Sequence, residues 1–149
     1  MTSADRLPDN ALAGLAAGSV PPGLHRWPPA TAVSGREEAL GAASAAGWYG
    51  AGLELEGTRD KETFLRRCAE GLSLPAWFGW NWDALYDCLT DLSWWTVPDR
   101  PPAGYLIVAG GWHGFEKAAP EVSGTAACIL EDAVAHWRKR NTPLAVLLG

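Results

Sequence analysis

The chain has few cysteines, and they form no recognisable metal or redox motif. Cys68, Cys88 and Cys128 are widely spaced and no CxxC pair occurs, so neither a zinc knuckle nor a redox dithiol is expected. Each lies among apolar neighbours in a segment predicted to be helical. We therefore expect all three to be reduced core residues. The sequence predicts no metal site and no cofactor.

Long apolar runs and catalytic motifs are also missing. No run approaches the roughly 20 apolar residues that span a bilayer, and no basic segment followed by an apolar one opens the chain. These absences predict a cytoplasmic protein with no membrane partner. HExxH, GxSxG and GxxxxGK[ST] do not occur, and His25, His113 and His136 are far apart. The sequence therefore argues against an enzyme.

What is present suits one compact domain. The chain has 149 residues, of which 48% are hydrophobic and 19% charged, a balance typical of a packed core rather than of disorder. The net charge of -5 and the pI of about 5.1 argue against nucleic-acid binding, which needs a basic surface.

Basic residues are absent from one segment altogether. No Lys or Arg occurs between Cys68 and Asp99, although this segment carries acids that account for the whole net charge and more than half of the tryptophans. The acids are Glu70, Asp83, Asp87, Asp91 and Asp99, and the tryptophans are Trp77, Trp80, Trp82, Trp94 and Trp95. Aromatic rings beside charge of one sign favour a surface built for a basic partner.

Hydrophobic patterning predicts an α/β fold. The apolar runs 105–109 and 144–148 are typical of strands covered on both faces, and alternation of strands with helices predicts a parallel sheet. We expect strands at 24–27, 48–56, 105–109 and 144–148. We expect helices at 36–46, 60–71, 81–92 and 123–140, the last capped by Ser123. We also expect one or two helical turns at 10–17 and one at 115–119.

The first 23 residues are polar and weakly patterned and could be flexible. The strand expected at 24–27 and the helix expected at 36–46 follow them as a short strand–helix element.

The helix predicted over 81–92 has two unlike faces. At about 100° per residue, its apolar residues share one side and its acids the other. The apolar side holds Leu85, Cys88, Leu89 and Leu92; the polar side holds Asp83, Tyr86, Asp87 and Thr90, with Asp91 at its edge. Asp83 and Asp87 repel each other at i,i+4 by ~0.2–0.5 kcal/mol, so they do not serve helix stability. Carboxylates that replace phosphates, beside the rings of Tyr86 and Trp77, predict binding to a basic cleft such as a nuclease active site.

Residues 74–90, LPAWFGWNWDALYDCLT, resemble the signature loop and helix of the barstar family of barnase inhibitors. The similarity extends over residues 50–149, and residues 1–49 lie outside it as an N-terminal extension. The resemblance implies that residues 50–149 form a barstar-like domain, a small parallel sheet of three core strands with helices packed on it, to which the extension can add one edge strand. It also implies a partner that is a secreted, guanyl-specific, barnase-type ribonuclease. It further implies that the acidic helix and its preceding loop plug the active site of that enzyme, and that the free inhibitor is a monomer.

The resemblance also assigns roles to single residues. Asp87 would occupy the phosphate position and Asp83 would pair with an arginine at the rim of the site. Trp77 stands where the family carries a tyrosine that packs on the catalytic histidine. Tyr86 replaces a family tryptophan, and Thr90 matches. Gly79 and Asn81 of the same motif are further candidates for the interface.

Two departures from the family pattern leave alternatives open. Asp91 and Leu92 stand where the family has Gly and Trp, and His136 falls where it has an acidic contact, which Asp91 could replace. A different basic protein partner therefore remains an alternative, as does a tryptophan-rich carbohydrate- or ligand-binding module. An acid–base pair of Asp83 and Asp87 is disfavoured, because neighbours on one helical face do not flank a substrate.

Overall fold

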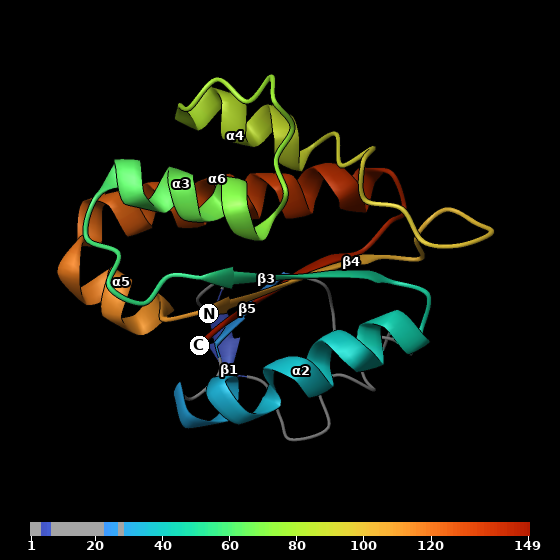
Figure 1. The fold of residues 1–149 in the computed structure, drawn as a ribbon, viewed down its shortest axis with the longest axis horizontal. Coiled ribbons are helices and arrows are strands. Elements are labelled where there is room, and N and C mark those ends of the chain that lie inside the picture. The colour runs from blue at the N-terminus through green and yellow to red at the C-terminus, as the bar shows by residue number, and fades with distance from the viewer. Residues whose placement is uncertain (1–3, 7–22, 27–28) are drawn as a thin grey trace.

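The computed structural model describes residues 4–6, 23–26 and 29–149, which form one five-stranded sheet with helices on both faces (Figure 1). The sheet order is β1-β2-β5-β4-β3, and every neighbouring pair is parallel. The strands are β1 (Ala4–Arg6), β2 (Leu24–Arg26), β3 (Tyr49–Glu54), β4 (Tyr105–Gly110) and β5 (Leu144–Leu148). The predicted turns at 10–17, and most of the predicted flexible segment 1–23, lie outside the described residues.

The predicted α/β class and parallel sheet are confirmed, with one more strand than expected. Two strands extend the three-stranded core instead of one: β2 pairs with β5, and β1 lies at the edge beside β2. Strand β1 is only three residues long and contains Asp5 and Arg6, so it carries none of the apolar alternation from which strands are predicted.

The helices divide between the two faces of the sheet. Helix α2 (Pro29–Ala45) is the helix of the described ranges that covers one face. The other face carries α3 (Lys61–Gly71), α4 (Trp82–Leu89), α5 (Trp112–Ala118) and α6 (Pro120–Lys139), with α4 lying farthest from the sheet (Figure 1). None of the helices in the described ranges combines the length and the apolarity that crossing a bilayer requires.

The two apolar runs are buried on both faces, as predicted. Alternate residues of β4 and β5, such as Ile107 and Val146, join the core beneath α3–α6. The residues between them, Leu106, Val108, Ala145 and Leu147, face α2. They form a second core cluster with Ala39 and Ala43 of α2 and with Trp48. Because side chains alternate along a strand, a run with no polar residue requires a cover on each side.

Two helices begin earlier than predicted, both at a proline. Helix α2 begins at Pro29 rather than near Arg36, and α6 begins at Pro120 rather than after Ser123. Proline fits the first helical turn because the missing N–H has no partner there. The predicted cap Ser123 is therefore wrong: its hydroxyl is buried inside α6 and donates to the Pro120 carbonyl at 3.1 Å.

Two of the three cysteines are buried as predicted, and the third is not. Cys68 and Cys88 lie in the core, whereas Cys128 on α6 is exposed. Residue 128 is two positions from each of the buried residues Ala126 and Leu130, a rotation of about 200° that turns it away from the core. Burial raises the pKa of the Cys68 thiol, which makes that residue unreactive.

We therefore expect one fast-reacting thiol in the folded protein. At pH 8, Cys128 should react with a disulfide reagent within seconds to minutes, and the other two thiols only after denaturation. The number of thiols titrated with and without denaturant measures this. In Cys128→Ser the fast phase should disappear, and a fast phase that persists would contradict the burial of Cys68 and Cys88.

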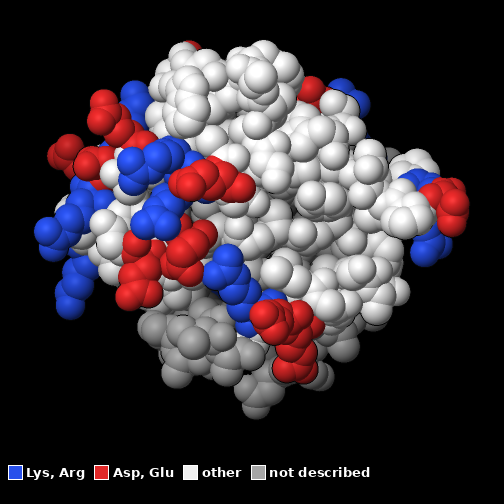
Figure 2. All heavy atoms as spheres, viewed as in Figure 1, with Lys and Arg blue, Asp and Glu red and all other residues white. Residues whose placement is uncertain are grey.

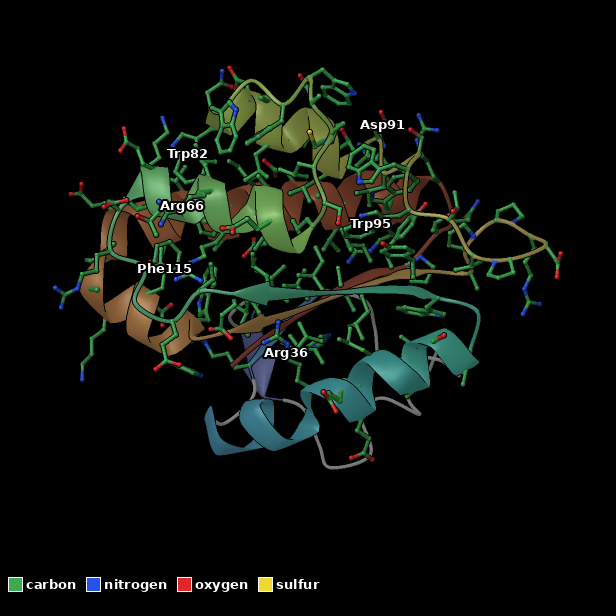
Figure 3. The ribbon with its side chains drawn as sticks, in the orientation of Figure 1. Arg36, Arg66, Trp82, Asp91, Trp95 and Phe115 are labelled. Atoms are coloured by element: carbon green, nitrogen blue, oxygen red, sulfur yellow. The ribbon has the colours of Figure 1, made fainter. Side chains whose placement is uncertain are left out.

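Between residues that the structure describes, two ion pairs join the N-terminal elements to the rest of the fold. The Arg26 guanidinium of β2 donates two hydrogen bonds to Glu116 of α5, at 2.7 and 3.0 Å. Arg36 of α2 donates to Glu54 of β3 at 3.0 Å and lies between that helix and the sheet (Figure 3). Because both pairs are partly exposed to water, each is expected to contribute only about 0–1 kcal/mol.

The pair at Glu116 predicts a small pH-dependent stability term. Its hydrogen bond with Arg26 holds the pKa of Glu116 below the ordinary value. The stabilisation is therefore present above the pKa of an unfolded glutamate and is lost as the pH falls through the lower folded value. In urea unfolding, Glu116→Gln should cost up to about 1 kcal/mol at pH 7 and almost nothing at pH 3. An equal cost at both pH values would contradict the ion pair as its source.

Candidate functional site

Helix α4 is held firmly by its apolar face and by both of its ends. Leu85, Cys88 and Leu89 are buried, as the periodicity predicted. At the N-terminus, the Asn81 side chain accepts from the Ala84 N–H at 2.8 Å, a standard N-cap. Near the C-terminus, the indole of Trp137 on α6 donates to the Leu89 carbonyl at 2.7 Å. The opposite face is thereby fixed in place and free of a packing role.

That opposite face presents unpaired carboxylates. Asp83 and Asp87 on this face, and Asp91 just after the end of α4, are exposed, and none of the three forms an ion pair with another residue that the structure describes. They lie in the tract without Lys or Arg, so no neighbour in the sequence compensates their charges. On the side of the molecule seen in Figure 2, charged side chains gather over α3 and α5, whereas the side of α4 that is turned to the viewer is largely uncharged.

The negative field of these acids reaches into the protein. Burial, followed by the charges of Asp87 and Asp91, raises the pKa of the Cys88 thiol to about 11. Burial and the Asp91 charge also raise the pKa of Tyr105. A second ionised group of the same sign is therefore disfavoured here, whereas a cation approaching from outside is attracted.

Aromatic rings flank the carboxylates. Trp77 and Trp80 of the loop before α4 are each 56% exposed, and Tyr86 on α4 is 36% exposed. Trp77 meets the ring of Trp94 edge-on at 6.1 Å, which holds it at the surface. We call Trp77, Trp80, Asp83, Tyr86, Asp87 and Asp91 the α4 surface. Large exposed rings are uncommon on a monomer and mark contact surfaces.

The other candidate residues lie beside this surface in different roles. Thr90 is half-buried and ends α4, and its hydroxyl donates to the Tyr86 carbonyl at 2.9 Å. Gly79 is exposed, with ordinary van der Waals room for a Cβ. Asn81 fixes the loop onto the helix, since its side-chain amide also donates to the Gly79 carbonyl at 3.2 Å.

His136 is the candidate that lies on α6 rather than on α4 or its preceding loop. It is half-buried on α6, its ring meets Trp137 edge-on at 5.2 Å, and its Nε2 is buried without a hydrogen-bond partner among the described residues. Trp137, rather than His136, connects α6 with α4. Any part of His136 in an interface remains a prediction.

Sequence reasoning missed Trp80 as a candidate. The indole is as exposed as that of Trp77, and its backbone is left-handed with φ 56°. Its position directly before the N-cap Asn81 was the available signal, because that residue lies outside the helical pattern that buries one face. In the described ranges, no group of three or more His, Cys, Asp or Glu side chains could hold a metal ion.

A family model places this geometry among known proteins. The model of barstar, the barnase inhibitor, matches residues 50–149, which include β3, every helix from α3 onward, and the α4 surface. No curated protein matched the chain. Because the match covers well over half of the sequence, the chain belongs to the barstar family.

Proposed function

We propose that this protein inhibits a secreted, basic, barnase-type ribonuclease by inserting α4 and its preceding loop into the RNA-binding cleft of the enzyme. The observation that carries the proposal is the set of exposed, unpaired carboxylates on a helix whose other face is buried. Asp83 and Asp87 would stand in for RNA phosphates, and Trp77 and Tyr86 would pack where bases stack. The protein acts by occlusion and performs no chemistry.

The rigidity of the surface supports inhibition. The N-cap at Asn81 and the buried Leu85 and Leu89 hold the carboxylates in place before the partner arrives. A preorganised surface loses less conformational entropy on binding than a flexible one. The mutual repulsion of Asp83 and Asp87, unfavourable in the free protein, is relieved when cationic side chains lie against them.

Titration of the full-length protein into barnase, with cleavage of a fluorogenic RNA as the readout, tests this proposal. We expect activity to fall linearly to zero at one equivalent of inhibitor. The association rate should fall by roughly ten- to a hundredfold between low and moderate salt, because charge steers the encounter. Binding that is indifferent to salt, or to the presence of a protein target, would instead favour a ligand-binding module.

A second candidate function is binding to a different basic protein through the same α4 surface. Asp91 stands at the edge of the α4 surface, and Leu92 is fully buried, at positions where the family pattern has Gly and Trp. A well-folded protein that inhibits no member of a panel of guanyl-specific ribonucleases would favour this second candidate.

A further inference from the structure

Trp80 has a backbone conformation that the packing of its own side chain does not explain. Its φ of 56° lies in the left-handed region, which a bulky L-residue occupies at a cost and glycine occupies freely. The side chain offsets little of this cost, because its indole is 56% exposed; its ring contact with the core is with Phe78, at 5.0 Å between centroids. Strained residues of this kind cluster at binding sites.

The backbone around Trp80 is held on both sides. Before it, the Phe78 N–H donates to the Pro75 carbonyl at 3.0 Å, and the Phe78 ring is buried. After it, Asn81 bonds both to the Gly79 carbonyl and to the Ala84 N–H. The indole is therefore presented at a fixed position, three residues before Asp83 and on the approach to the acidic face.

The indole of Trp80 has no cation–π partner among the described residues. Among the described residues, the cation–π contact is that of Lys61, whose Nζ lies 5.5 Å from the ring centroid of Trp82. Trp82 points from α4 toward α3, away from the loop (Figure 3). No Lys or Arg occurs between Cys68 and Asp99, so the residues near Trp80 in the sequence supply no cation to its ring. The nearby carboxylates attract a cation from a partner.

We infer that Trp80 is a specificity-determining residue of the interface, whose indole receives a guanidinium or ammonium group at the rim of the basic partner's cleft while Asp83 and Asp87 fill the cleft itself. This inference rests on the proposed function and adds a contact to it. Trp80 favours partners that carry a cation at the rim of the cleft over partners that have a basic cleft but no such cation.

Binding and stability measured on matched variants test the inference. Trp80→Gly removes the ring and the strain together, so it should bind barnase about 10- to 30-fold more weakly while its unfolding midpoint stays the same or rises. Trp80→Phe should retain most of the affinity. Ser73→Gly is the control: Ser73 has φ 52° on the same loop, so the substitution relieves similar strain without removing a ring and should leave the affinity unchanged.

Fluorinated tryptophans incorporated at position 80 alone identify the occupant. Each added fluorine weakens the negative face of the ring while the apolar area is kept, so a cation predicts stepwise loss of affinity. If affinity falls in Trp80→Gly but does not change with fluorination, the inference that the ring binds a cation is wrong. Unchanged affinity in Trp80→Gly would overturn the role of Trp80 and leave the proposed function standing. A wild-type protein that binds no ribonuclease of a guanyl-specific panel would overturn both.

Discussion

Replacement of Asp87 by alanine is expected to abolish stoichiometric inhibition of barnase. Asp87 lies in the middle of the exposed face of α4, without an ion pair among the described residues, so its charge is available to a partner. In the proposed complex, the substitution leaves the enzyme's buried cations uncompensated. Removing one partner of a buried ion pair costs about 3–5 kcal/mol, a general figure for such pairs, or roughly two to nearly four orders of magnitude in affinity.

The loss should be specific to that position and not to charge in general. Glu70→Ala removes one negative charge from the same tract, but from α3 rather than from α4. It should lower the association rate slightly and leave dissociation almost unchanged, because distant charges act through steering. Asp87→Asn, which keeps the shape and removes the charge, should resemble Asp87→Ala. Equal effects of Asp87→Ala and Glu70→Ala in the fluorogenic assay would contradict the phosphate-mimic role.

The helical wheel predicted the division of α4 because the pattern is local. Leu85, Cys88 and Leu89 had to face the core at helical spacing, and the exposed side of Asp83 and Asp87 follows from the same geometry. The start of the helix was also predicted to within one residue, since Asn81 is its N-cap. The functional assignment of these carboxylates depends on a partner, and the fold does not test it.

Other features escaped prediction because they depend on tertiary context. The short strand β1 exists only because β2 lies beside it, and its residues carry no periodic signal. Cys128 was assigned to the core by residue type, whereas its rotation relative to Ala126 and Leu130 places it outside. The conformation of Trp80 is set by the loop on either side of it, which composition does not encode.

Residues 50–149 expressed alone are expected not to fold stably, although the family model matches all of them. Deletion of the preceding residues removes α2, Trp48 and the strand that pairs with β5. Leu106, Val108 and Leu147 would then lie bare on one face of the sheet. At about 1.5–3 kcal/mol for each large apolar side chain, this exposure costs about 5–9 kcal/mol, comparable with the entire net stability of an ordinary domain.

The size of the loss in stability shows whether the apolar cover from α2 or the two ion pairs stabilise the fold more. Arg26→Ala together with Arg36→Ala breaks both ion pairs in the full chain and should lower the free energy of unfolding by no more than about 2 kcal/mol, leaving a cooperative transition. The fragment should show no cooperative urea transition, weak near-ultraviolet circular dichroism from its tryptophans, and self-association on gel filtration. If the fragment unfolds cooperatively at a urea concentration near the midpoint of the full chain, the fold does not need α2 to cover that face of the sheet. In that case the carboxylates of α4 would be held by α3 and α6 alone, and the fragment should inhibit barnase as well as the full chain.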